Sequence, residues 1–272
     1  MPKTGHKLSA ADRFRQGDFR YTLISIISLL GFFTIWQLLC ASGLVSDRYL
    51  STPIRTILLF FDKLTNSKPD GNTLGVNVLT SLQVSMSGFV LAAGIGVPLG
   101  LLMGWYRGID KFVRPLFEIL RPIPPVAWIP FTILWLGIGL WAKAFIIFFT
   151  TMVPCVINSY TGVKLTNKTL INVAKTCGAS NFQIFLRVAV PSSLPVMFAG
   201  LRIAIGNAWG CLVAAEMLAA NAGLGFMIAM GRQFVRPDII VLGMLVIGIV
   251  GVLFSVLVSL LEKKLVRWRA TQ

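Results

Sequence analysis

Two ionisable side chains lie within one long apolar stretch in the second half of the chain. Arg202 and Glu216 are about 21 Å apart along a helix, too far to pair, and Asn207 and Trp209 lie between them. A charged group among lipids is costly, so such residues face the protein interior or water and commonly serve a function. We therefore predict that Asn207, Trp209 and Glu216 line a polar path. Pairing of Glu216 with Lys143 or with an arginine of an outer loop is the structural alternative.

A second apolar stretch is interrupted by prolines. They lie at positions 122, 124, 125 and 130, within the string RPIPPVAWIP at residues 121–130. Each proline removes a backbone donor, and unsatisfied backbone groups at membrane depth must be buried in protein or face water. Broken backbone at this depth commonly lines a path or a binding site, whereas a kink covered by neighbouring helices is the structural alternative. We predict that Pro124, Pro125 and Trp128 belong to a path.

A polar stretch, residues 170–187, separates two of the apolar segments. Its apolar residues recur at helical spacing on both sides of a glycine, which predicts two short amphipathic helices joined at that glycine. The stretch is too polar to span a membrane, and its pattern is typical of an element that docks on a partner. A helix lying on the membrane surface is the alternative. The candidate docking residues are Asn172, Ala174, Lys175, Gly178, Ala179 and Phe182.

The composition is that of an integral membrane protein. Of the residues, 56% are hydrophobic and only 13% are charged, whereas about a quarter are charged in a soluble domain. The net charge of +15 is spread between and beyond the apolar stretches, which argues against nucleic acid as a partner. The cysteines and the single histidine have no metal-ligand spacing. No phosphate-binding loop, carboxylate pair or Ser/His/Asp set is present, so we predict no catalytic residue, no metal and no cofactor in this chain.

Six stretches of about 20 apolar residues predict an all-α fold with six transmembrane helices. The first is longer than the apolar core of a signal peptide and is interpreted as an uncleaved span. In the second, glycines at positions 96, 100 and 104 indicate close helix packing within the subunit, or a face on a path or dimer seam. The predicted spans are residues 21–40, 79–105, 116–136, 142–163, 194–220 and 239–261.

Lys and Arg gather in both tails, in the loop after the second span, and in the polar stretch between the fourth and fifth spans. The positive-inside rule places all four regions in the cytoplasm, so both termini are predicted to be cytoplasmic. Residues 1–20 and 263–272 are then basic cytoplasmic tails, and residues 21–262 form a single transmembrane domain. Residues 54–64 are predicted to form an amphipathic helix at the outer surface.

The polar stretch resembles the cytoplasmic loop of ABC importer permeases. The matching pattern begins at Asn172, has its glycine at Gly178 and ends at Pro195. The strings LRPIPPVAWIP, WLGIG and GASNFQIFLRVAVPSSLP look like the sulfonate, taurine, nitrate and bicarbonate branch of these binding-protein-dependent permeases. The likeness covers residues 81–268, and several strings occur in the family's order.

The resemblance implies a transmembrane core over about residues 79–262 and a coupling loop over about residues 164–190. It also implies a second copy of the chain, with the path between the copies, and a cytoplasmic ATPase dimer docked on the coupling loop. An extracytoplasmic binding protein would deliver a small anionic solute. ATP and Mg would be bound by the ATPase, and this chain would be a non-catalytic subunit in a bacterial inner membrane.

Two departures from the family pattern bear on this interpretation. Asn172 replaces the family's usual glutamate, and Leu140 and Trp141 follow WLGIG where taurine and sulfonate relatives usually carry Glu and then Ser or Thr. The loop lacks the extra residues of nitrate permeases, so an alkanesulfonate or taurine-like solute is favoured over nitrate, bicarbonate or an aromatic carboxylate. A secondary carrier and a structural membrane anchor are alternatives of other classes; a carrier would be expected to show internal repeats, and none is clear.

Overall fold

The computed structural model describes residues 10–43, 46 and 49–265; the outermost parts of the two predicted basic tails, residues 1–9 and 266–272, lie outside them. Within the described residues the chain forms helices and no strand, which confirms the predicted all-α fold. In chain order the helices are α1 (Ala10–Ala41), α2 (Pro53–Lys63), α3 (Leu74–Trp105), α4 (Arg107–Leu120), η1 (Pro125–Trp128), α5 (Ile129–Leu136), α6 (Leu140–Lys164), α7 (Lys168–Thr176), α8 (Asn181–Ile184), η2 (Phe185–Ala189), α9 (Val190–Ala219), α10 (Leu224–Gln233) and α11 (Pro237–Leu265).

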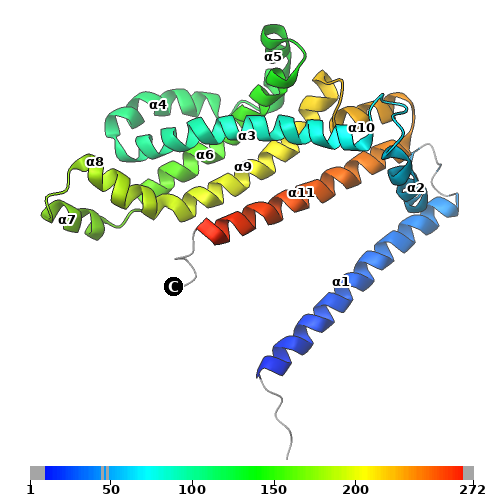
Figure 1. Ribbon diagram of the computed structural model, residues 1–272, viewed down its shortest axis with the longest axis horizontal. Coiled ribbons are helices and arrows are strands. Elements are labelled where there is room, and N and C mark those ends of the chain that lie inside the picture. Colours follow the sequence, from blue (N-terminus) through cyan, green and yellow to red (C-terminus); the bar gives the residue numbers. More distant parts are fainter. Residues whose placement is uncertain (1–9, 44–45, 47–48, 266–272) are drawn as a thin grey trace, which may run out of the picture.

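Helices α3, α6 and α9 lie side by side and form the centre of the bundle (Figure 1). The predicted glycine row lets α3 approach α6 closely, because a Cβ at Gly100 would lie 2.4 Å from the carbonyl oxygen of Val156. A Cβ at Gly104 would lie 2.8 Å from the Cβ of Val163. The row therefore packs two helices of the same chain together, which is the first of its two predicted roles.

The third predicted span is a broken one. Helices α4 and α5, with η1 between them, meet at an angle of 86°, and α4 begins at Arg107, before the predicted start of the span. The break follows from the prolines, which remove the backbone donors that would continue α4. Five other helices are long and apolar enough to cross a membrane, so the described residues hold six spans if the bent pair counts as one.

The fifth predicted span is longer than expected at its start. The helix continues from Asn181 through α8 and η2 into α9, although the sequence pattern predicts a start at residue 194. The residues before Pro191 are already helical, as α8 and the π-helix η2, so this proline follows a wider turn inside a continuous helix and does not open a new one.

The first helix stands apart from the bundle. Helix α1 extends away from the other helices and meets α2 at its C-terminal end (Figure 1). Only 6% of the residues in its apolar part, Leu23–Ala41, are buried. Its large apolar side chains are therefore available to lipid or to another chain.

Helix α2 confirms the predicted amphipathic segment and is held by a buried ion pair. The side chains of Lys63 and Asp70 are both fully buried and form a salt bridge. The ammonium of Lys63 also donates to the carbonyl oxygen of Asn72 at 2.7 Å, and Asp70 accepts from the amide of Asn77 on α3 at 2.7 Å. These bonds fix the segment between α2 and α3 against the bundle.

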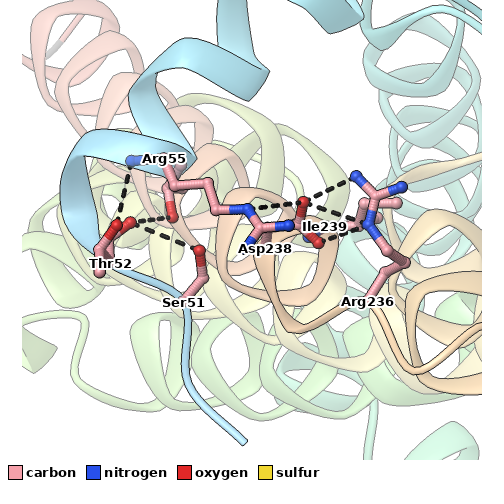
Figure 2. A network of polar contacts seen from close by, with 7 residues as sticks. Ser51, Thr52, Arg55, Arg236, Asp238 and Ile239 are labelled. Carbon is pink, nitrogen blue, oxygen red and sulfur yellow. Dashed lines mark hydrogen bonds and ion pairs between the residues drawn. The ribbon is translucent and has the colours of Figure 1, made fainter. Parts of the chain in front are cut away.

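A second polar cluster joins α2 to α11, with Asp238 between two arginines (Figure 2). Arg236 donates three hydrogen bonds to the two carboxylate oxygens of Asp238, at 2.9, 3.2 and 2.7 Å. The Arg55 guanidinium on α2 lies 3.9 Å from the same carboxylate, which also accepts from the backbone N–H of Ile239 at 3.1 Å. Hydrogen bonding to Asp238 raises the pKa of Arg236. At the end of the bundle that carries α2 and α10, here called the α2–α10 end, the buried side chains of Lys63, Asp70 and Asp238 therefore tie α2 to the bundle.

Candidate functional site

The polar stretch of the sequence forms the opposite end of the bundle, here called the α7–α8 end (Figure 1). No residue of α7 is buried, and three apolar side chains of the pair are exposed: Leu170 by 51%, Val173 by 57% and Phe182 by 61%. Exposed apolar residues on a short amphipathic helix pair are typical of a docking element. Leu170 and Val173 were not among the predicted docking residues, although the helical spacing of the apolar residues contains them.

Local hydrogen bonds give the helix pair its shape. The side chain of Asn167 caps α7 by accepting from the backbone N–H of Thr169 at 2.8 Å. Ser180 and Gln183 form a reciprocal capping box at the start of α8, with distances of 2.9 and 3.3 Å. Between the helices, Gly178 has a φ of +79°, a left-handed conformation that glycine adopts without strain.

The structure brings the predicted docking residues together on this one element. Four of them are exposed on α7, at the turn, or on α8, whereas Ala174 and Ala179 are half-buried between the helices. The backbone N–H of Ala179 donates to the carbonyl oxygen of Ala174 at 3.1 Å, which closes the turn. The four exposed residues are Asn172, Lys175, Gly178 and Phe182.

A cavity of about 280 Å³ lies where the third span is broken, between the end of α4, η1, α6 and α9. Pro125 and Asn207, both predicted path residues, line it together although they are far apart in the sequence. Trp128 stacks on Phe149, a lining residue, with ring centroids 4.6 Å apart. Pro124 directly precedes η1 and sets its start.

The wall of this cavity is mostly apolar and carries few polar groups. Arg121, at the end of α4, and Asn207, on α9, supply hydrogen-bond donors, and the guanidinium of Arg121 lies 3.7 Å from the carboxylate of Glu118. Phe117 and Phe149 are among the apolar lining residues. Arg121 was not among the predicted path residues, although its place directly before the proline run could have indicated it. A cation and an amide beside an apolar wall can hold a molecule with an anionic group and a carbon chain.

Trp209 lies apart from this cavity. It is 7% exposed, its indole N–H donates to the carbonyl oxygen of Ile247 on α11 at 2.9 Å, and its ring packs on Phe254 at 5.4 Å. Two positions along a helix correspond to a rotation of about 200°, so Asn207 and Trp209 must point to opposite sides of α9. Here Trp209 belongs to the packing between α9 and α11.

Glu216 also lies away from the cavity, at the α2–α10 end, and is fully buried. Its two carboxylate oxygens accept from the hydroxyl of Ser81 at 2.9 and 2.8 Å, and one accepts from the backbone N–H of Gly225 at 2.9 Å. The Ser81 oxygen in turn accepts from the backbone N–H of Leu224 at 2.8 Å. Leu224 and Gly225 open α10, so the carboxylate occupies the N-terminus of that helix, where its charge is stabilised.

The alternative prediction, pairing of Glu216 with Lys143, is not what satisfies the carboxylate. Lys143 is also buried, but among the described residues no ion pair within 4 Å joins it to Glu216, and the hydrogen bonds to the carboxylate come from α3 and α10. The turn before α10 is shaped around the carboxyl group, since a Cβ at Gly223 would lie 2.4 Å from its carbon atom. In this structure Glu216 joins α3, α9 and α10.

Comparison with known proteins identifies the family. The family model for the binding-protein-dependent transport system inner membrane component matches residues 96–270, more than half of the chain. A putative ABC transporter permease protein of Methanocaldococcus jannaschii is 41% identical over 71% of this chain and 73% of its own length. The taurine transport system permease protein of Escherichia coli is 32% identical over 92% of this chain and 90% of its own length. The bicarbonate transport system permease protein of Synechocystis is 36% identical over the same shares.

Solved structures agree at the level of the fold. A bacterial ABC transporter involved in import of the acidic polysaccharide alginate is similar with a TM-score of 0.60 and 15% identity, over 93% of this chain and 99% of that one. The methionine ABC transporter MetNI in an inward-facing conformation is similar with a TM-score of 0.57 and 21% identity, over 70% of this chain and 93% of that one. The chain therefore belongs to the family of binding-protein-dependent transport system inner membrane components and is a non-catalytic permease subunit of an ABC importer.

Proposed function

We propose that this permease carries a small organic anion, and that an alkanesulfonate or a taurine-like solute is its substrate. The observation that supports this is the cavity at the broken span, with Arg121 and Asn207 beside an apolar wall. A sulfonate headgroup accepts hydrogen bonds from a guanidinium and an amide, and its carbon chain contacts aromatic side chains.

The apolar lining of this cavity favours an organic anion over an inorganic one. Nitrate and bicarbonate have no apolar part, so burying them against Phe117 and Phe149 would remove water from the ion without apolar contacts in return. The names of the relatives leave this choice open, because they include permeases for taurine, aliphatic sulfonates, bicarbonate and nitrate. An aromatic carboxylate would fit the same chemistry and is the runner-up.

The proposed assembly contains two copies of this chain. The face of α9 that carries Asn207 also exposes Ile203, Gly206 and Gly210, and no atom lies within 4 Å of a Cβ built at either glycine. Such a face allows a second helix to approach closely, which would place the path between the two copies.

Each end of the bundle then meets a different partner. The exposed helix pair at the α7–α8 end would dock on a cytoplasmic ATPase dimer, which binds ATP and Mg, while this chain holds no cofactor of its own. The α2–α10 end would face the extracytoplasmic binding protein. Because Lys and Arg gather at the α7–α8 end and in both tails, both termini would lie in the cytoplasm of a bacterial cell.

Reconstitution into vesicles tests this proposal. The chain would be combined with an ABC ATPase and a binding protein encoded beside its gene, and ATP-dependent uptake would be measured for taurine, an alkanesulfonate, nitrate, bicarbonate and an aromatic carboxylate. Uptake of the sulfonates alone is expected. Uptake of nitrate or bicarbonate alone would contradict the sulfonate assignment, and failure to form any complex with an ATPase would contradict the proposed assembly.

A substitution in the cavity sharpens the same test. Arg121→Gln removes the cation from the wall, and we expect about a tenfold lower uptake of sulfonate at limiting concentration, since a hydrogen bond to a charged group contributes about 1.5–3 kcal/mol. Arg107→Gln is the matched control because it removes the same charge from the exposed start of α4, away from the cavity. Equal uptake by the two variants would show that Arg121 does not bind the solute.

A further inference from the structure

The connection between the docking element and the bundle is a π-helix. Residues Phe185–Ala189 form this wider turn, which joins α8 to α9. Single π turns inside α-helices are rare and occur often at functional sites. Its first residue, Phe185, is 7% exposed, so the segment that follows an exposed docking helix begins with a buried aromatic ring.

The ring of Phe185 lies in a socket at the junction of α3 and α4. Its centroid is 5.9 Å from the ring of Trp105, the last residue of α3, and 5.8 Å from the ring of Tyr106. Leu101 and Val163 complete the same buried cluster. The π-helix that directly follows the docking element therefore has a side-chain contact with the start of α4 as well as its covalent connection to α9.

Tyr106 forms the joint between α3 and α4. It is the single residue between the two helices, and its extended backbone, with φ −99° and ψ 109°, lets the chain reverse so that α4 runs back beside α3 (Figure 1). No residue of α4 is buried. Its contacts include a hydrogen bond from Arg114 to the hydroxyl of Tyr160 on α6. A helix with an exposed surface on a one-residue joint can tilt at little cost in packing.

The far end of α4 reaches the cavity. Phe117, Leu120 and Arg121 all line it, so a tilt of α4 about Tyr106 would move the cation and part of the apolar wall. The route from the docking element to the cavity then consists of two steps, from Phe185 to Tyr106 and along α4. Because packed side chains transmit displacement instead of absorbing it, the contact between the two rings can carry motion.

We propose that Phe185 is a positioning residue that transmits movement of the α7–α8 pair to α4 and thereby to the solute cavity. This inference rests on the proposed docking of an ATPase on α7 and α8. The covalent path through η2 leads to α9, which contributes Asn207 to the cavity. Arg121 belongs to the end of α4, so movement of Arg121 requires the separate contact through the aromatic socket.

The test measures the movement of α4 directly. A nitroxide label would be attached at Lys111→Cys, an exposed site on α4, in a Cys177→Ser background, in the full transporter with its ATPase and binding protein. Pulsed electron paramagnetic resonance would give the distance between the labels of the two copies, without nucleotide and after trapping with ATP and vanadate. We expect this distance to change on trapping in the otherwise unaltered protein.

The variant Phe185→Ala separates coupling from docking. We expect the change in label distance to fall to less than half and the uptake of taurine to fall about tenfold, while the same amount of ATPase co-purifies. Phe254→Ala is the matched control, because it removes a similar ring contact, with Trp209 at 5.4 Å, from a part of the bundle away from α4. It should keep the distance change.

A second variant approaches the socket from the other side. Tyr106→Leu removes the partner ring, leaves Phe185 in its cluster, and should also reduce the distance change, which keeps the proposal testable if Phe185→Ala does not accumulate. A full distance change in either variant would overturn the inference. If the unaltered chain forms no complex with an ATPase, the proposed function has failed, whereas a working transporter that is indifferent to both substitutions contradicts this inference alone.

Discussion

At the α7–α8 end the candidate docking residues are largely exposed, and the hydrogen bonds that shape the helix pair join residues within a few positions of one another. At the α2–α10 end Glu216, Lys63 and Asp238 are buried, and Glu216 accepts from Ser81, 135 positions earlier in the chain. The first end can therefore change its partner contacts without unfolding the bundle. The second end holds distant segments together, so removing one buried group there should lower the free energy of unfolding of the whole bundle.

The largest effect is expected for Glu216→Ala. The substitution leaves the Ser81 hydroxyl and the Gly225 N–H without their acceptor in a buried site, and we expect a loss of about 3 kcal/mol or more in the free energy of unfolding. Thermal unfolding in detergent would measure it. The control is Glu118→Ala, whose side chain is 57% exposed and should cost little. Equal melting temperatures for the two variants would show that the buried carboxylate does not hold the α2–α10 end.

A smaller loss of stability is expected when one glycine at each end is replaced by alanine. In Gly223→Ala the new Cβ would meet the carboxyl group of Glu216 at 2.4 Å, at a φ of +125°, so strain and a clash combine to cost about 2–3 kcal/mol. In Gly178→Ala no atom lies within 4 Å of the new Cβ, and the left-handed backbone alone costs about 1 kcal/mol. Chemical denaturation of both variants would compare them. A larger loss at Gly178 would reverse the contrast between the two ends.

The smallest effect on stability is expected for Phe182→Ala. Its side chain is 61% exposed, so the free energy of unfolding should change by less than about 0.5 kcal/mol. Co-purification of the ATPase should nevertheless fall strongly if the ring fills a pocket on the partner. Leu165→Ala, with a side chain 69% exposed before α7 begins, is the control. Unchanged co-purification would remove Phe182 from the docking surface and leave Leu170 and Val173 as its apolar contacts.

Features of the fold that depend on neighbouring residues were predictable from the sequence. Apolar stretches of sufficient length predicted the spans, the prolines predicted the break between α4 and α5, and apolar spacing around Gly178 predicted α7 and α8. Each signal is local, because hydrogen bonding within a helix and the removal of a donor by proline act within a few residues. For the same reason, the docking residues came out together on one element.

The candidate cavity was only partly predictable. Pro125 and Asn207 meet there, but Trp209 turns to the opposite side of α9, and Arg121 was not among the predicted path residues. Residue types alone did not say which side of α9 would face the broken span. That depends on how α4, α6 and α9 pack.

The sequence by itself determined the class of protein, the number of spans, the broken third span and the family, because composition, hydropathy and a contiguous motif carry that information. Tertiary structure decided what the buried charges do. Glu216 looked like a path residue in a membrane helix, yet its partners are a serine on α3 and the first turn of α10, and only packing brings those groups within hydrogen-bond distance. A carboxylate in an apolar stretch must be satisfied somewhere, and the three-dimensional arrangement of the helices settles where.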